Sequence, residues 1–489
     1  MEISNLSSEV QAILGSVSSI ATEVVLGLGI ILIILLDLIR YGKEKKGLNL
    51  LALSLLGLNL AYLAISIPVE GQTFLGVLNT ITKEKAFLIL IDLIGVFYVV
   101  FQLVLGKPDI QKKNNKLSGE GETLALIFSI ILGLHVLIKA NNLLLLFIGL
   151  ELISLPSYIL TAFRFRKVSG EGAIKYLLLG VISTAIMLYG MSWMYGIAGS
   201  LNFSEVTTAL LQQPVEISTI VFVFFLAGLL FKLSVFPMYF WAPDMYESAP
   251  IGTAAFLSIA PKIAALLALK HFVDGFGVAL FEHPIIPNIL IGIAILTMFI
   301  GNVSALGQEG SRRMMAYSTI GQMGLLMLVL FLDASLNYQT MLFYMTAYAF
   351  ANLVIFMGVG ILEQRKDSDR IASFAGEGKG NLALGIAMTI AFISLVGLPP
   401  FAGFSAKLFV FTGVWSAYEQ FQNDWLFYAL IAALINTVIS LYFYLKIPYQ
   451  LFIKELSDEG FSLLKREKSF LILFALPLIV LFILPQILI

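Results

Sequence analysis

Residues 226–243 read LAGLLFKLSVFPMYFWAP, and this stretch decides how the rest of the chain is interpreted. The residues on both sides of Lys232 are apolar enough to lie in lipid, which predicts a membrane-spanning helix. Pro237 follows five residues later, and a proline inside a helix removes one backbone donor and frees a carbonyl. In lipid, freed backbone groups are tolerated only against protein or water. A cation beside a helix break therefore indicates a buried polar site.

The composition places the whole chain in a membrane. Of its 489 residues, 59% are hydrophobic and 12% are charged, whereas soluble domains carry about 25% charged residues. The formal net charge of −1 excludes a nucleic-acid-binding surface as the main function. The chain has no cysteine, and hence no cysteine-ligated iron–sulfur cluster and no thiolate nucleophile. We expect no metal site and no cofactor in this chain, so redox or nucleotide chemistry must lie on other chains.

Fourteen stretches are long and apolar enough for a membrane span, which needs roughly 20 apolar residues. They lie at about 20–39, 48–67, 86–105, 122–140, 142–162, 172–198, 216–240, 250–270, 285–306, 314–333, 338–362, 382–416, 424–446 and 468–488. The stretch 382–416 is too long for one straight helix and contains Pro399 and Pro400, which predicts two half-helices. The sequence thus predicts an all-α integral membrane protein with about 14 transmembrane helices.

The loops between these spans predict the orientation of the chain. Lys and Arg gather in the loops after odd-numbered spans, for example at Arg40, Lys43, Lys45 and Lys46, and are sparse after even-numbered spans. Positively charged loops stay on the cytoplasmic side. The N-terminal MEISNLSSEV has no Lys or Arg, which is unlike a signal peptide, so residues 20–39 are expected to be retained. We expect a multi-pass protein of the cell inner (cytoplasmic) membrane with both termini on the outer (periplasmic) side.

Four of the 30 Lys and Arg residues fall inside predicted spans, namely Lys175, Lys232, Lys262 and Lys407. A charge at the bilayer centre costs roughly 2.5–3.5 kcal/mol on insertion scales, so it usually faces the interior of the bundle. Lys407 follows Pro400 in the divided span, and Lys262 directly follows Pro261. Charges beside broken helices are typical of the ion sites of transporters. We therefore interpret Lys232 as a switchable proton site; the alternative is a structural lysine that pairs with a carboxylate to fix helix packing.

A glutamate, a further lysine and a histidine in the predicted spans are also candidates for the proton path. Glu151 lies near the centre of the fifth span, and its natural partner is Lys232, in a pair whose proton affinities depend on each other. Lys175 stands four residues after Glu171, a spacing that favours an ion pair on one helix face, so its role is either functional or structural. His135 in the fourth span is either a relay or an interior histidine with satisfied hydrogen bonds.

The remaining intramembrane acids and aromatics receive simpler interpretations. Glu23, Asp37 and Asp92 lie nearer the ends of their spans, and we assign them no functional role. The Trp and Tyr residues of 239–250 are expected to be interfacial anchors that lead into the next helix.

Six stretches, in this order along the chain, resemble a known family. They are GLELISLPSYILTAFRFRK, EGAIKYLLLGVISTAIMLYG, FKLSVFPMYFWAPDMYESAP, FLSIAPK, RRMMAYSTIGQMG and SLVGLPPFAGFSAKLFVF. The family is the antiporter-like subunit N (subunit 2) of bacterial NADH–quinone oxidoreductase, respiratory complex I. The resemblance runs from about residue 20 to the C-terminus and is most specific over 149–410. It implies two inverted five-helix repeats, each with a discontinuous helix.

The resemblance also implies how the chain is divided. Residues 1–121 would be an N-terminal three-helix segment, and 122–270 the first antiporter-like repeat, with spans 4–8 and a break at Pro237. Residues 285–446 would be the second repeat, with spans 9–13 and a break at Pro399-Pro400. Residues 447–489 would form a C-terminal loop and helix.

Residue roles follow from the same resemblance. Glu151 would be the glutamate paired with Lys232, Lys262 the central relay lysine, and Lys407 the lysine on the exit side. The sister subunit M carries a glutamate at the position of Lys407. Near the eleventh span only Tyr348 and other uncharged residues occur, so the path from Lys262 to Lys407 would need water or polar side chains.

The function implied is a proton-translocating membrane subunit of an enzyme, in which protons pass through a buried Glu/Lys chain coupled to quinone reduction in other subunits. NADH, flavin, iron–sulfur clusters and quinone would belong to partner subunits. The partners would be a neighbouring antiporter-like subunit, small membrane subunits and the lipid bilayer, without nucleic acid. The alternative is a subunit of a multisubunit cation/proton antiporter or a membrane-bound hydrogenase. A purely structural membrane scaffold would leave the interior lysines and both breaks unexplained.

Overall fold

The protein is a bundle of long helices. The computed structural model describes residues 16–39, 46–66, 71–74, 77–80, 82–106, 119–163, 167–333, 336–455 and 461–488. The helices that coincide with predicted spans are α2 (Ala21–Ile39), α3 (Lys46–Ile65), α4 (Thr82–Leu105), α6 (Glu120–Ile138), α7 (Leu143–Ala162), α8 (Lys167–Ala198), α10 (Val215–Leu233), α12 (Ile251–Asp274), α13 (Ile286–Leu306), α14 (Ser311–Met327), α15 (Asn337–Lys366), α17 (Leu382–Val396), α18 (Ala402–Phe421), α19 (Asp424–Phe452) and α20 (Lys465–Ile483). The predicted all-helical membrane fold is confirmed.

Short elements connect the long helices. They are η1 (Val17–Ile20), β1 (Gly71–Thr73), β2 (Leu78–Thr80), α9 (Phe203–Leu211), α11 (Trp241–Ser248), η2 (Gly277–Leu280), η3 (Leu328–Phe331), η4 (Ile371–Phe374), α16 (Glu377–Gly380) and η5 (Pro485–Ile487). The strands β1 and β2 pair antiparallel between α3 and α4, and the sequence did not predict this hairpin. Among the described residues, 12 helical segments are long and apolar enough to cross a membrane. The predicted spans outside that set are the divided one, α17–α18, and α20, which opens with charged residues.

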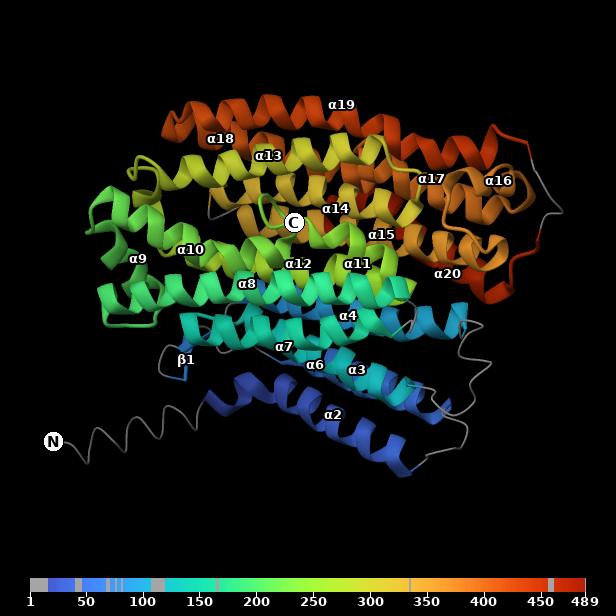
Figure 1. Ribbon diagram of the computed structural model, residues 1–489, viewed down its shortest axis with the longest axis horizontal. Helices are drawn as coiled ribbons and strands as arrows, with labels where there is room; N and C mark the ends of the chain where they lie inside the picture. Colours follow the sequence, from blue (N-terminus) through green and yellow to red (C-terminus); the bar gives the residue numbers. More distant parts are fainter. Residues whose placement is uncertain are drawn as a thin grey trace.

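The helices lie side by side, with α2 at one edge of the bundle and α19 at the opposite edge (Figure 1). The three segments built on α12, α14 and α15 are almost wholly buried and form the middle of the bundle. The last helix, α20, returns to pack against α15, α17 and α18.

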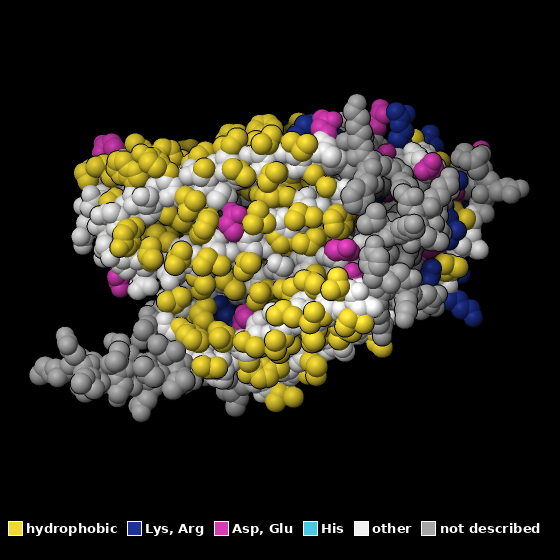
Figure 2. Space-filling view, turned by 60° about the horizontal axis from the view of Figure 1, so that its bottom comes forward, with side chains coloured by type: hydrophobic (Ala, Val, Ile, Leu, Met, Phe, Trp, Pro, Cys, Tyr) yellow, Lys and Arg dark blue, Asp and Glu magenta, His cyan; other side chains and the backbone are white. Residues whose placement is uncertain are grey.

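The outer surface suits a lipid environment. Figure 2 shows hydrophobic side chains over most of one face of the bundle, whereas Lys and Arg side chains gather at one end. Exposed Leu, Ile and Val residues recur along α2, α8 and α19. An apolar patch this large on a protein in water would be an aggregation hazard, whereas in a bilayer it is the surface that contacts lipid or partner subunits.

Two helices are interrupted near the middle of the bundle, as the prolines predicted. The helix α10 ends at Leu233, four residues before Pro237, and the chain resumes helical structure only at Trp241 in α11. In the second case α17 ends at Val396, and α18 begins at Ala402, beyond Pro399-Pro400. Each break leaves a short non-helical segment. Ser234 and Val235 begin the first segment and are buried, whereas Pro237, Pro399 and Pro400 are exposed on the surface of this chain.

Glycines bring α13 and α14 into close contact. A Cβ atom at Gly301 of α13 would lie 2.7 Å from the Cα atom of Gly321 on α14. One turn further along α14, a Cβ atom at Gly324 would lie 2.8 Å from the Ala294 carbonyl oxygen of α13. Small residues at helix–helix contacts let backbones approach in membranes, where packing replaces the hydrophobic driving force.

We predict that Gly301→Ala lowers the free energy of unfolding by about 1–3 kcal/mol, the usual effect of overpacking. Gly307→Ala is the matched control, because no atom of the described residues lies within 4 Å of its added Cβ and its backbone is right-handed, with φ −81°. Thermal or denaturant unfolding in detergent micelles measures both. Equal stability of the two variants would show that the α13–α14 contact can expand without loss.

Candidate functional site

At the first helix break, Ser234 lies two residues after one buried lysine and bonds a second. Lys232 lies in the last turn of α10, and Ser234 caps that helix in the left-handed region, with φ 59°. A non-glycine residue there stores about 1–3 kcal/mol of strain, which surrounding structure must hold in place. The hydroxyl of Ser234 accepts a hydrogen bond of 3.0 Å from Nζ of Lys262, which comes from α12.

The surroundings of Lys232 are apolar. Its side chain is buried, and its Nζ atom has no hydrogen-bond partner among the described residues. Glu151 of α7 lies within electrostatic range of Lys232, but no ion pair joins these two described side chains. The Glu151 carboxylate instead accepts a hydrogen bond of 3.1 Å from Thr184. The structure thus brings the predicted pair together without direct contact, and a buried ammonium in such a place requires water, a counter-ion or a dipole to stay charged.

Aromatic rings surround Lys262. Its side chain is fully buried, and Nζ lies 5.6 Å from the ring of Trp241 and 5.9 Å from the ring of Tyr246. Rings at this distance attract a cation through their quadrupole. Trp241 and Tyr246 are themselves buried, so the interpretation of these residues as interfacial anchors is wrong. They belong to α11, which continues beyond the break along α8 and α14, and Trp241 stacks on Tyr176 of α8.

The second break holds Lys407 in a different way. Lys407 lies in α18, beyond the break, and its Nζ donates a hydrogen bond of 2.7 Å to the carbonyl of Val396, the last residue of α17. The last carbonyls of a helix lack intrahelical partners and carry partial negative charge. Gly397 then turns the chain with φ +87°, and a Cβ atom there would lie 2.6 Å from the Lys407 side chain. The ammonium therefore caps the first half-helix.

Uncharged side chains extend from Lys262 toward the second repeat. Ser258 stands one turn before Lys262 on α12, and its carbonyl lies 3.2 Å from the hydroxyl of Tyr348 on α15. The same hydroxyl lies 3.0 Å from Oγ1 of Thr319 on α14. All of these side chains are buried. Sequence reasoning noticed Tyr348 but had no means of pairing it with Thr319.

The polar contacts continue along α14. Gln322 donates hydrogen bonds to the hydroxyl of Tyr444, at 2.9 Å, and to the carbonyl of Leu395, at 3.0 Å. The Tyr344 hydroxyl bonds to the Gln322 amide oxygen, and Ser318 lies 2.6 Å from the Tyr444 hydroxyl. Sequence reasoning did not find these residues, because Gln, Ser and Tyr in a span carry no charge signal.

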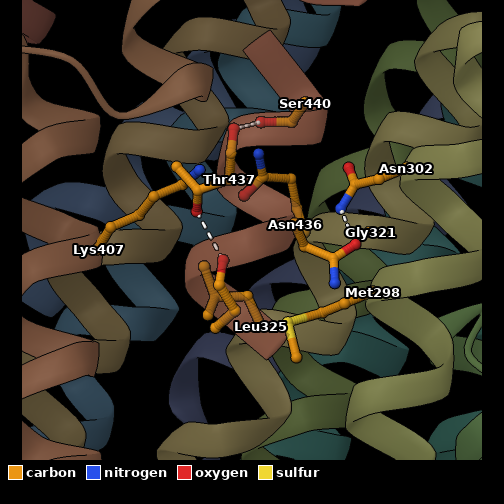
Figure 3. Close-up of a pocket in the computed structure, with 10 residues that line it drawn as sticks. Met298, Asn302, Gly321, Leu325, Lys407, Asn436, Thr437 and Ser440 are labelled. Atoms are coloured by element: carbon orange, nitrogen blue, oxygen red, sulfur yellow. Dashed lines mark hydrogen bonds between the residues drawn. The ribbon is translucent and has the colours of Figure 1, made fainter. Parts of the chain in front are cut away.

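Gln322 and Lys407 line the same small cavity. Its other lining residues are Met298, Asn302, Gly321, Leu325, Ala433, Asn436, Thr437 and Ser440. Figure 3 shows Lys407 on one side and Asn302 on the other, where the Asn302 amide donates a hydrogen bond of 3.0 Å to Asn436. Buried polar groups thus lie at intervals between Lys262 and Lys407.

Two other predicted residues lie outside this path. Lys175 forms ion pairs with Glu171 at 2.9 Å and with Asp244 at 3.0 Å, and its side chain is half exposed. Burial alone would raise the pKa of Asp244, but the hydrogen bonds from Lys175 and Arg313 hold it below its usual value. These ion pairs join α8, α11 and α14 at the surface. They do not join the buried lysines.

His135 also lies apart from the lysines. It is fully buried in α6, and its ring faces Glu23 and Asp92. The helices that supply these partners, α2 and α4, belong to the N-terminal part of the chain.

Among the described residues, no group of three or more His, Cys, Asp or Glu side chains could hold a metal ion. The chemistry that this arrangement supports is the movement of protons between amines, carboxylates and hydroxyls.

The chain is similar to known membrane proteins. The chain matches the family described as "NADH:quinone oxidoreductase/Mrp antiporter, TM" over residues 140–440. It is 33% identical over 449 residues to NADH-quinone oxidoreductase subunit N 2 of Sorangium cellulosum, which covers 88% of this chain and 87% of that protein. It is 31% identical over 458 residues to NAD(P)H-quinone oxidoreductase subunit 2 of Crocosphaera subtropica, with coverages of 92% and 84%.

A solved structure extends the comparison to the fold. A chain of respiratory complex I from Thermus thermophilus with bound aureothin matches with a TM-score of 0.77 and 27% identity, covering 95% of this chain and 97% of that one. The chain therefore belongs to the transmembrane family of NADH:quinone oxidoreductase and Mrp antiporter subunits, within the group of subunit N, or subunit 2.

Proposed function

We propose that this chain is the proton-translocating membrane subunit of an NADH–quinone oxidoreductase. Protons pass through its buried glutamate and lysines while other subunits reduce quinone. The observation that carries the proposal is the set of buried polar groups between the lysines. Lys262 bonds Ser234, which ends the helix of Lys232. Tyr348 bonds Thr319 and the Ser258 carbonyl, and Gln322 lines one cavity with Lys407. Relatives named as oxidoreductase subunits, which align with almost the whole chain, support it.

Each residue has a distinct task in this proposal. Glu151 supplies a negative charge near Lys232, and its protonation changes how firmly Lys232 holds its own proton. Lys262 receives the proton across Ser234, since both lysines are within electrostatic range of each other. The hydroxyl and amide groups of α14, α15 and α19 then connect Lys262 to Lys407. Because a hydroxyl can donate and accept at once, it can carry a proton without holding a charge.

We further propose that Lys407 is on the exit side. Beyond Lys407, the last turn of α18 carries Glu419 and the first turn of α19 carries Asp424, with no Lys or Arg between them. Acidic groups at such a mouth attract released protons. The Lys and Arg of the opposite loops support the proposal of a cytoplasmic side there, in a cell inner membrane, with both termini on the outer side. The two repeats, 122–270 and 285–446, would then be the uptake half and the exit half of one path.

The cofactors of the enzyme belong to partner subunits in this proposal. Because the chain has no cysteine, it cannot ligate an iron–sulfur cluster through thiolates, and NADH, flavin and quinone sites would likewise be formed by other chains. The partners are other membrane subunits, including a neighbouring antiporter-like subunit and small membrane subunits. The exposed apolar faces of α2 and α19 offer them surface.

A second function follows from the family description, which includes Mrp antiporters. A cation/proton antiporter or membrane-bound hydrogenase subunit could use the same lysines. NADH oxidation by the purified complex, sensitive to quinone-site inhibitors, supports the first function. Ion exchange without any redox activity supports the second.

The first test of the proposed function is Lys232→Ala. We predict that the complex assembles but that proton pumping, and the quinone reduction coupled to it, are largely abolished. Lys446→Ala is the control, because Lys446 bonds the Gln308 carbonyl at 2.6 Å and lies off the path. Quinone reduction and proton uptake are measured in membrane vesicles. Wild-type values for both in a normally assembled Lys232→Ala complex would remove Lys232 from the mechanism.

A second test concerns Glu151 and Lys232 as a pair. When two residues interact, the effect of changing both differs from the sum of the two single effects by a coupling free energy of about 0.5–3 kcal/mol. Glu151→Gln should destabilise the chain by leaving Lys232 without its counter-charge, whereas Glu151→Gln combined with Lys232→Met should recover most of that loss. Unfolding of the singles and the double in detergent measures the coupling. Strictly additive losses would mean that the two charges act independently.

A further inference from the structure

A second group of buried charges lies among the N-terminal helices, separate from the lysines. His135 of α6 is fully buried. Its Nε2 atom lies 3.0 Å from Oδ1 of Asp92 on α4, and its Nδ1 atom lies 3.4 Å from Oε1 of Glu23 on α2. A single imidazole thus bridges two carboxylates that belong to two different helices.

Neighbouring side chains hold the two carboxylates in place. The Asn59 amide of α3 donates a hydrogen bond of 2.8 Å to Oδ2 of Asp92. Nζ of Lys139 lies 2.7 Å from Oε1 of Glu23, and the Thr22 hydroxyl donates to Oε2 of Glu23 at 2.9 Å. Four helices at one edge of the bundle, α2, α3, α4 and α6, therefore supply one polar cluster (Figure 1).

The geometry of the ring determines where a proton must lie. A neutral imidazole has one N–H and one lone pair, so one of its nitrogens would face a carboxylate oxygen lone pair to lone pair. A doubly protonated ring instead donates to Oδ1 of Asp92 and holds its second N–H 3.4 Å from Oε1 of Glu23, as an ion pair outside hydrogen-bond geometry. Charge leads to the same result: with neutral His135, the two carboxylates and Lys139 leave a net charge of −1, and a buried net charge is costly. With a protonated ring the cluster is neutral.

Among the described residues, no further charged side chain forms an ion pair with the ring. Two more helices pack against α6; α7 carries Glu151 and Tyr158, and α12 carries Lys262, Lys270, His271 and Asp274. None of these described residues forms an ion pair or hydrogen bond with His135. Nζ of Lys139 and Nδ1 of His135 face the same oxygen of Glu23, and no three His, Asp or Glu side chains among the described residues are placed to hold a metal ion.

We propose that Glu23, His135 and Asp92 form a second proton-binding site, in which one proton is held on His135 between the two carboxylates. Glu23 is the point of exchange, because its side chain is 12% exposed while those of His135 and Asp92 are fully buried. The site lies at the end of the bundle where α2 begins and α6 ends. It rests on its own contacts and does not depend on the role of the lysines.

The protonation of His135 can be measured directly, because the chain has three histidines. The full chain with ¹⁵N-labelled histidine is placed in lipid bilayers, and His135→Gln identifies the His135 signals by difference. At neutral pH we expect both ring nitrogens of His135 to carry a proton. His283 is an internal reference: its Nδ1 accepts from the Ile286 amide at 3.1 Å and burial lowers its pKa, so it should show one N–H.

Substitution of Asp92 or Glu23 tests whether these carboxylates hold the proton on His135. Asp92→Asn should convert the His135 signals to those of a neutral ring, and Glu23→Gln gives a second reading if Asp92→Asn does not fold. Asp37→Asn is the matched control, because Asp37 lies on α2 but about 21 Å along the helix from Glu23, and it should leave the His135 signals unchanged. A single N–H on His135 in the wild-type chain at neutral pH would overturn the proposal, as would signals that neither acid variant alters.

Discussion

The structure depends on how the polar backbone groups freed at two helix breaks are satisfied inside a membrane. A carbonyl without a partner in lipid costs several kcal/mol, and each break creates several such groups. At the second break the ammonium of Lys407 bonds the terminal carbonyl of α17. At the first break the indole of Trp241 bonds the Phe231 carbonyl at 3.0 Å, and Thr297 of α13 accepts from the Phe236 amide at 3.0 Å.

This requirement explains why charge and irregular backbone occur together. A lysine in a regular membrane helix would face only apolar neighbours, whereas a lysine at a break finds carbonyls, hydroxyls and room for water. Ser234 illustrates the point, since the left-handed conformation that ends α10 also presents its hydroxyl to Lys262. The residues between the lysines carry no charge, which avoids repulsion with the ammonium groups while still providing hydrogen bonds.

The sequence predicted the features that depend on length, hydropathy and proline. The membrane helices, both breaks and the burial of Lys232, Lys262 and Lys407 follow from an apolar window that contains a cation. The contacts did not follow, because they join residues that are distant along the chain. Gln322 and Tyr444 have ordinary compositions for a span, and only the packing of α14 beside α19 makes them partners.

The N-terminal cluster was missed for the same reason. Glu23 and Asp92 were placed near the ends of their spans and given no role, and each alone would be an unremarkable acid. The two acids can share a proton only because α2, α4 and α6 bring them to opposite sides of His135. Trp241 and Tyr246 were misplaced because an interfacial position and a buried position just beyond a helix break have the same composition.

The central claim is that uncharged hydrogen-bonding side chains connect the lysine of α12 to the lysine of α18. The most direct test is the number of protons pumped per NADH oxidised in sealed vesicles by a Gln322→Leu complex. Leucine has a similar volume to glutamine but neither donates nor accepts, so it interrupts the contacts with Tyr344, Tyr444 and the Leu395 carbonyl. Gln308→Leu is the control, because among the described residues the Gln308 amide donates to the Ser304 carbonyl of its own turn and to no other group. The account predicts a lower proton ratio for Gln322→Leu and a normal ratio for the control. A normal ratio in an assembled Gln322→Leu complex would contradict it.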